Sequence, residues 1–189
     1  MPTEQGAILL AIARSAIAQE FGQAFSAKTD APWLQEPGAT FITLMLSGEL
    51  RGCIGTLHAH RSLLEDVKAN AVAAAFRDPR FPPLQQAELN NIRVEVSLLS
   101  PSEPLIFDSE QQALAQLRPK IDGVIFEYGL YRSTFLPQVW EQLPDPKTFM
   151  AHLKQKAGLE ASFWADSVKL SRYSVQKWKE SELLREEQS

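Results

Sequence analysis

One segment, Ile92–Leu99 with the sequence IRVEVSLL, constrains the fold more than any other because its apolar and polar residues alternate. Successive side chains of an extended strand point to opposite faces, so Ile92, Val94, Val96 and Leu98 share one face. Arginine, glutamate and serine side chains occupy the other face. The segment is therefore predicted to be a strand of a sheet with one apolar face.

Several other segments are rich in strand-forming residues. The further predicted strands are Ala39–Leu46, Leu50–Leu57, Gly123–Tyr128, Tyr131–Leu136 and Val168–Val175. Ser47-Gly48 and Gly129-Leu130 are turn signals between successive strands, although leucine is unusual in a tight turn. Because these strands do not alternate with helices in a βαβ rhythm, the sequence predicts an α+β fold with a mostly antiparallel sheet and flanking helices.

Helices are predicted where a capping residue precedes apolar residues at helical spacing. They span about residues 3–25, 62–78, 108–117 and 145–158. Ser62 and Glu65 form a capping box, and Asp145 stands before a proline at the first helical position. Asp108 is the predicted N-cap of the third helix. The three prolines of the following DPRFPPL segment, which begins at Asp78, exclude regular helix there.

The composition fits a soluble globular chain, with 189 residues of which 44% are hydrophobic and 22% charged. That apolar content excludes disorder as a description of the whole chain. The length suits one domain or two small lobes that share a core. The net charge of −4 disfavours a nucleic-acid binder that depends on bulk charge, because phosphate affinity comes mainly from clustered Lys and Arg.

The single cysteine and the N-terminal segment bear on the compartment. One cysteine excludes an internal disulfide framework and any metal site that needs two cysteines from one chain. Glu4 precedes the apolar N-terminal residues and Arg14 interrupts them, so this segment is predicted to be a helix and no secretion signal. No stretch of about 18 apolar residues occurs. We therefore expect a cytoplasmic protein without membrane contact.

The densest group of reactive residue types is the string RGCIGT, from Arg51 to Thr56. Gly52 and Gly55 would let backbone N–H groups approach a ligand, Arg51 could pair with an anion, and Cys53 could act as a nucleophile. In the structural alternative, Cys53 is buried and serves as a small hydrophobic residue. The residues alone leave both interpretations open.

A second candidate group follows the predicted helix 62–78. Asp78, Arg80 and Phe81 lie on a loop that prolines make rigid, where they could bind a polar ligand. In the alternative that the sequence favours, Asp78 caps a turn and pairs with Arg80.

The three histidines are weaker candidates. His58 and His60, two residues apart, could join Cys53 as three metal ligands, but loop histidines are more often solvated, and we predict no metal and no other cofactor. His152 lies on a predicted helix without a recognisable partner. No GxSxG, GxGxxG or GxxxxGK[ST] string is present, so no serine-hydrolase elbow or phosphate loop is predicted.

In their order along the chain, these segments resemble the AMMECR-type domain, whose bacterial and archaeal members are called AmmeMemoRadiSam system protein A. The matching strings are LRGCIGTL at Leu50–Leu57, AAFRDPRFPPL at Ala74–Leu84, VEVSLLSP at Val94–Pro101, DGVIFEYG at Asp122–Gly129, FLPQVW at Phe135–Trp140, KAGL at Lys156–Leu159 and SRYSVQ at Ser171–Gln176. The combination of the Arg-Gly-Cys-Ile-Gly string with the Asp-Pro-Arg-Phe string is specific, whereas either string alone would be weak.

The resemblance implies an α+β fold with two unequal lobes around a cleft. We expect one AMMECR-type domain over residues 1–189, with a larger lobe of about 1–100 and 160–180 and a smaller lobe of about 101–159. The charged tail, 180–189, is expected to be frayed.

The resemblance also implies a functional site at the segment Leu50–Gly55 and two partners, a Memo-like protein and a radical SAM enzyme. One hypothesis is a binding or adaptor module whose ligand cleft is formed by Gly52, Ile54, Gly55, Thr56, Asp78, Arg80 and Phe81. The alternative is a cysteine-dependent enzyme, or a component of one, that acts on a small anionic substrate with Cys53 and Arg51 as its catalytic residues. The exposure of Cys53 separates the two hypotheses, because a buried thiol is usually inert.

Overall fold

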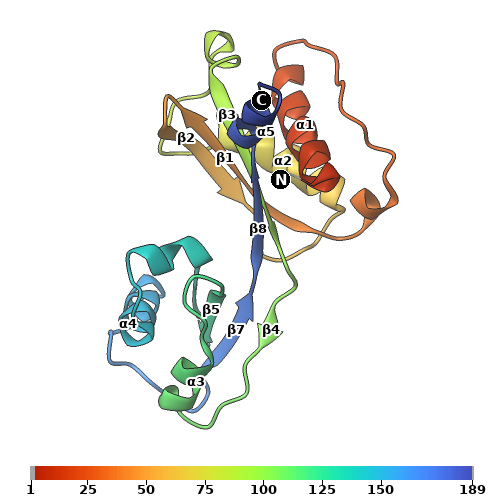
Figure 1. Ribbon diagram of the computed structural model, residues 1–189. Coiled ribbons are helices and arrows are strands. Elements are labelled where there is room, and N and C mark those ends of the chain that lie inside the picture. The colour runs from red at the N-terminus through yellow and green to blue at the C-terminus, as the bar shows by residue number, and fades with distance from the viewer. Residues whose placement is uncertain (1–2, 189) are drawn as a thin grey trace. The chain divides into compact units, whose positions relative to one another are not determined.

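The computed structural model describes residues 3–188, and the chain divides into two compact units (Figure 1). One unit comprises Met1–Leu99 and Gln176–Ser189, and the other comprises Ser100–Val175. Each unit has its own antiparallel four-stranded sheet and its own hydrophobic core. The predicted α+β class with mostly antiparallel sheet is therefore confirmed.

The first unit is a sheet covered by helices. Its elements are α1 (Glu4–Gln19), η1 (Pro32–Gln35), β1 (Ala39–Leu46), β2 (Glu49–Gly55), α2 (Leu63–Phe76), η2 (Gln86–Glu88), β3 (Ile92–Leu99), β8 (Val175–Lys179) and α5 (Glu180–Glu186). The strand order is β2-β1-β3-β8, so β2 lies at one end of the sheet. The register pairs Ile42 with both Ile54 and Val96, and Thr43 with both Cys53 and Glu95.

The predicted alternation decides which face of this sheet is covered. Ile92, Val94 and Val96 of β3 are fully buried, and they pack with Leu9 and Ile12 of α1 in one core. Residues of α2 belong to the same core, so α1 and α2 lie on the same face of the sheet. Successive side chains of a strand point to opposite faces, so Cys53 and its neighbour Ile54 point in opposite directions. The Cys53 side chain lies on the face of the sheet away from α1 and α2, beside that of its register partner Thr43.

The second unit is smaller and is built around aromatic residues. Its elements are β4 (Glu103–Pro104), α3 (Glu110–Gln116), β5 (Gly123–Tyr128), β6 (Tyr131–Phe135), η3 (Pro137–Glu141), α4 (Pro146–Lys156) and β7 (Lys169–Tyr173), with strand order β4-β7-β5-β6. Trp140 stacks on Phe149 with ring centroids 3.7 Å apart, and its Nε1 donates to the carbonyl of Asp122 over 2.7 Å. A buried indole N–H thus has its partner.

Both predicted tight turns are confirmed, and they use different geometries. Ser47 and Gly48 both have positive φ, as the type I′ turn requires. Between β5 and β6 the positive φ falls on Gly129, as in a type II′ turn, whose second position accepts an ordinary L-residue. This explains how Leu130 can occupy a tight turn, where its side chain is fully exposed.

The N-caps of three helices agree with the sequence and one does not. Thr3, Ser62 and Asp145 accept backbone hydrogen bonds at the starts of α1, α2 and α4, as predicted. The prediction of Asp108 as the cap of α3 was wrong by one residue: Ser109 accepts from the backbone N–H of Gln112. The first helix ends at Gln19 and not near 25, because a turn with positive φ at residue 22 stops it.

The C-terminal segment differs most from expectation. The single predicted strand Val168–Val175 is replaced by two strands, β7 and β8, which belong to different sheets. Residues 160–175 lie in the second unit, although the larger lobe was expected to include about 160–180. The reason is that β7 pairs with β5 along Lys169–Tyr173. The tail contains the helix α5, and Ser189 lies outside the described residues.

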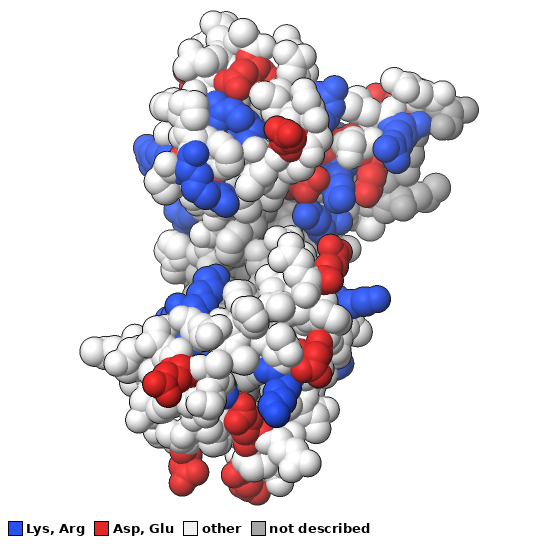
Figure 2. Space-filling view, turned by 90° about the vertical axis from the view of Figure 1, so that its left-hand side faces the viewer, with Lys and Arg blue, Asp and Glu red and all other residues white. Residues whose placement is uncertain are grey.

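Within the described residues, no helix combines the length and the apolar character needed to cross a membrane. Figure 2 shows Lys and Arg side chains interspersed with Asp and Glu on the face that it presents. Mixed charge of this kind is the ordinary pattern of a solvated surface.

Candidate functional site

Cys53 and the loop after α2 are joined through one carboxylate. Asp78 is buried, and its Oδ2 accepts from the backbone N–H of Cys53 over 2.9 Å. The Arg80 guanidinium donates to both oxygens of Asp78, from Nε over 3.0 Å and from Nη2 over 2.7 Å. Arg80 Nη2 also donates to the carbonyl of Cys53 over 3.4 Å. The two strings that the sequence singled out are therefore in direct contact.

The charge state of this group follows from its hydrogen bonds. The Arg80 guanidinium, followed by the N–H groups of Cys53 and Arg80, holds the pKa of Asp78 far below its ordinary value, against the opposing effect of burial. The hydrogen bond to Asp78 raises the pKa of Arg80 in turn. Asp78 is ionised at neutral pH, but its strongly lowered pKa makes it a weak proton acceptor and therefore a poor general base for Cys53.

Arg51 has a different partner from the one that the enzyme hypothesis required. Its Nε and Nη2 donate to the two carboxylate oxygens of Glu88 over 2.9 and 3.1 Å. This bidentate pair lowers the pKa of Glu88. Arg51 Nη1 is buried and has no hydrogen-bond partner among the described residues. The guanidinium is thus used within the fold, with one donor left over.

The two motif glycines of β2 allow neighbouring parts of the fold to approach its backbone closely. A Cβ on Gly52 would come within 3.0 Å of the carbonyl oxygen of Ala74, so the backbone of α2 lies directly against β2. A Cβ on Gly55 would come equally close to the ring of Phe41, which lies opposite it in the register. Glycine is required at both positions because protein atoms already fill the space that a side chain would occupy.

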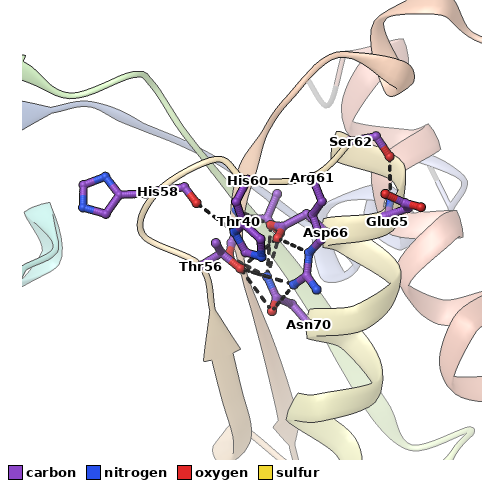
Figure 3. Close-up of polar contacts among 9 residues, drawn as sticks. All are labelled: Thr40, Thr56, His58, His60, Arg61, Ser62, Glu65, Asp66 and Asn70. Carbon is purple, nitrogen blue, oxygen red and sulfur yellow. Dashed lines mark hydrogen bonds and ion pairs between the residues drawn. The ribbon is translucent and has the colours of Figure 1, made fainter.

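The side chain of Thr56 belongs to a polar network with Asp66 and Asn70 (Figure 3). The centre of the network is Asp66, which is fully buried on the first turn of α2. Its oxygens accept from the hydroxyl of Thr56, from the N–H and hydroxyl of Thr40 and from Arg61 Nε, each over 2.8 Å. Asn70 Nδ2 donates to Asp66 over 3.1 Å and to the carbonyl of Thr40 over 3.0 Å. The network ties the ends of β1 and β2 to α2.

What remains accessible is a small surface around Cys53. Cys53 is half-buried, and Thr43 Oγ1 donates to its Sγ over 3.3 Å. The Arg80 side chain is 55% exposed and lies over the half-buried ring of Phe81, with 5.4 Å from its Cζ to the ring centroid. Arg80 Nη1 makes no hydrogen bond within residues 3–188. This surface therefore offers a thiol, a guanidinium edge and an aromatic ring. Ile54 lies on the opposite face of the sheet, packed against the core.

The histidines lie apart from this chemistry. His58 and His60 are exposed on the loop after β2, where the Nδ1 of His60 lies 3.1 Å from the carbonyl oxygen of His58 (Figure 3). His152 is exposed on α4 of the second unit. In the part of the chain that the structure describes, no three His, Cys, Asp or Glu side chains are grouped as metal ligands would be.

Three residues around the motif were not predicted from the sequence: Glu88, Asp66 and Asn70. Glu88 carries a weak signal, because Gln85 and Glu88 have capping-box spacing and the N–H of Gln85 donates to Glu88 over 2.7 Å. Asp66 and Asn70 are four residues apart and so lie on one face of α2. A charged residue on the buried face of a predicted helix was the signal that could have identified the network.

Comparisons with known proteins agree on one family. A sequence model of the AMMECR1 family matches residues 10–178. The chain is 41% identical over 136 residues to Protein MJ0810 of Methanocaldococcus jannaschii, covering 71% of this chain and 68% of that protein. It is 38% identical over 179 residues to Protein SSO0193 of Saccharolobus solfataricus, covering 90% and 79%.

A solved structure supports the same assignment. The fold is similar to the crystal structure of the uncharacterized protein PH0010 from Pyrococcus horikoshii, with a TM-score of 0.82 and 32% sequence identity, covering 93% of this chain and 91% of that one. The family-model match, over residues 10–178, includes the strands and helices that carry the motif and its loop. The chain belongs to the AMMECR1 family.

Proposed function

We propose that this protein is a non-catalytic binding or adaptor module that acts with a Memo-like protein and a radical SAM enzyme. Its ligand site would be the surface formed by Cys53, Arg80 and Phe81. The family resemblance implies the two partners, and the contacts of the motif residues support the site. The observation that carries the proposal is that the charged groups of the motif are paired with each other, while one guanidinium edge stays exposed.

The pairing removes the parts that an enzyme would need. A nucleophilic cysteine requires a base or a depressed pKa, and an arginine lowers the pKa of each of the two carboxylates beside the motif, Asp78 and Glu88, which makes both weak bases. Arg51 is buried against Glu88 and does not reach a substrate as a free anion receptor.

The exposed edge of the Arg80 guanidinium suits recognition of a hydrogen-bond acceptor or an anionic group. Arg80 is fixed in place by Asp78 and by the Phe81 ring, so its free Nη1 would bind a carboxylate or carbonyl of a partner with little loss of side-chain freedom. The long side chain is already ordered in the folded protein, so binding would cost little further conformational entropy. Such fixed arginines are common anchors of protein interfaces.

A cysteine-dependent enzyme remains the second candidate because of one observation, the partial exposure of Cys53. Thr43 donates to its sulfur, and the Arg80 guanidinium donates to its backbone carbonyl, so a hydroxyl and a cation both lie beside this residue.

Two measurements distinguish the candidates. The first mixes the protein with the Memo-like protein and the radical SAM enzyme of its own organism and measures complex formation by analytical ultracentrifugation. The binding-module proposal expects a complex of defined ratio that Arg80→Gln weakens at least about tenfold, whereas Lys28→Gln, at another exposed cation, leaves it unchanged. Absence of association at high micromolar concentration would overturn the proposal.

The second measurement is the rate of iodoacetamide alkylation at the only thiol of the chain, native against denatured, across pH. A native rate below the denatured rate at every pH supports the binding module. A native reaction whose pH midpoint lies well below the denatured one identifies an activated thiolate, and the enzyme would then be favoured.

A further inference from the structure

A groove in the first unit, remote in sequence from the motif, lies between the first and last helices. It has a volume of about 550 Å³, within the range of small-molecule sites. α1 contributes Ala7, Leu10, Ala11 and Arg14, which fall at positions i, i+3, i+4 and i+7 and so share one face. The sequence alone gave no indication of a role for these four residues.

The other wall repeats the same spacing. Glu180, Leu183 and Leu184 on α5 line the groove at i, i+3 and i+4. Leu183 packs against the core, whereas Leu184 is 41% exposed. Opposite these leucines, α1 presents two small residues one helical turn apart, Ala7 and Ala11. This part of the groove is apolar.

The other end of the groove is polar. Arg14 pairs with Glu180 through Nε and Nη2, and it also donates to the carbonyls of Leu89 and Ile92, so all three of its nitrogens are used. The charges of these two lining residues are therefore paired with each other. Arg14 lies seven residues from Ala7, which places the polar and apolar ends about 10 Å apart.

Free donors gather beside this ion pair. Arg93 also lines the groove, and its Nη1 donates to the carbonyls of Asn90 and Ile92. Its Nε and Nη2 make no hydrogen bond within the described residues. Ser15 and Ser26 lie 3.3 Å apart, so one hydroxyl donates to the other and the second keeps a free proton. Glu187 also lines the groove, seven residues after Glu180 on α5. Its carboxylate therefore lies about 10 Å along the helix from the polar end.

We propose that this groove binds a linear amphiphile with a carboxylate head and an alkyl chain of about eight carbons. Arg93 and the serine hydroxyls receive the head, and the chain lies along Ala7 and Ala11 and covers Leu184. A charge-assisted hydrogen bond from a guanidinium with spare donors suits a carboxylate. The alkyl chain removes the exposed leucine surface from water.

The test uses sodium octanoate as the probe and the full chain labelled with ¹⁵N. Amide signals of α1 and α5 are expected to shift saturably, with a Kd of about 1 mM or below. Ala11→Leu fills the hollow at an exposed position of a helix that favours leucine, and it should weaken binding at least about tenfold. Ala115→Leu, at an exposed alanine of α3 in the second unit, is the matched control and should leave the Kd unchanged.

The head is tested separately with 1-octanol, which has the same chain without the charge. Arg93→Gln should weaken octanoate about fivefold or more while it leaves 1-octanol unaffected. The proposal is overturned if octanoate causes no saturable shift at 10 mM, if Ala11→Leu binds as the unaltered chain does, or if Arg93→Gln affects both probes equally. A spectrum of Ala11→Leu that retains the dispersion of the parent shows that the variant is folded.

Discussion

The backbone N–H of Cys53 and the carboxylate of Asp78 meet over 2.9 Å, across 25 residues of sequence. The same carboxylate accepts the backbone N–H of Arg80 over 3.1 Å and the Arg80 side chain. One buried aspartate therefore fixes both the motif strand and the loop whose arginine faces solvent. The position of the proposed recognition surface depends on this carboxylate.

Removing the carboxylate should destabilise the protein. In Asp78→Ala the N–H of Cys53 loses its acceptor, and an unsatisfied buried donor costs about 1–3 kcal/mol. We expect the free energy of unfolding, measured by urea titration, to fall by about that amount. Arg80→Ala is the comparison variant and should cost less than Asp78→Ala, because the Asp78 carboxylate then still accepts the backbone N–H groups of Cys53 and of residue 80. Equal losses in the two variants would contradict this account.

Stability should fall in acid through the same group. The folded state holds the pKa of Asp78 and of Glu88 below the unfolded values, which are near 4. Carboxylates with a depressed folded-state pKa stabilise the fold above the unfolded-state pKa, and this stability is lost as the pH falls below it. The free energy of unfolding should therefore be nearly constant between about pH 7 and 5 and decline from about pH 4 downward. Asp78→Asn should show a shallower decline, and an unchanged acid dependence in that variant would disprove the assignment.

The two motif glycines should respond differently to an added methyl group. Gly52→Ala forces its Cβ onto the backbone carbonyl of Ala74, which cannot move without α2, so a loss of about 3 kcal/mol or more is expected. Gly55→Ala meets the side chain of Phe41 instead. In a Phe41→Ala background, the cost of Gly55→Ala should shrink while that of Gly52→Ala stays the same. Urea unfolding of the five variants (the two glycine variants, Phe41→Ala and the two double variants) measures both couplings. A Gly52→Ala cost that also shrinks would show that the Phe41 ring, and not α2, causes the destabilisation.

The Asp66 network should be the most sensitive polar group of the first unit. Asp66→Ala leaves the N–H of Thr40 without an acceptor and the Arg61 side chain without its carboxylate, so a loss of about 3–5 kcal/mol is expected. Ser62→Ala removes only the N-cap of the same helix and should cost about 1 kcal/mol. Thermal unfolding followed by circular dichroism compares them. A smaller loss for Asp66→Ala than for Ser62→Ala would show that the network is not fully formed.

Much of the fold follows from local rules that the sequence displays. The alternation at Ile92–Leu99, the turn at Ser47-Gly48 and the caps at Thr3, Ser62 and Asp145 each depend on neighbouring residues, and the structure confirms them. The C-terminal segment could not be predicted in this way. The division between β7 and β8 depends on which distant strand each one pairs with, and that information is not local.

The site shows the same division between local and distant information. The residue types drew attention to two strings, one at Cys53 and one at Asp78, which lie in contact. The pairing of Asp78 with Arg80, two residues apart, was the favoured interpretation, and the structure has it. The partner of Arg51 was not predictable, because Glu88 is 37 residues away and reaches it only once the chain has folded. The burial of Asp66 likewise depends on the packing of α2 against β1 and β2.

The contact between Asp78 and Cys53 has one further consequence, which concerns aggregation. β2 is an edge strand of its sheet. An edge strand normally exposes a row of unpaired N–H and C=O groups, with which another extended chain can pair. At Cys53 both of these groups are already taken, the N–H by a carboxylate and the C=O by a guanidinium. The same two charged side chains that shape the surface around the thiol thus prevent a foreign strand from adding to the sheet at this residue.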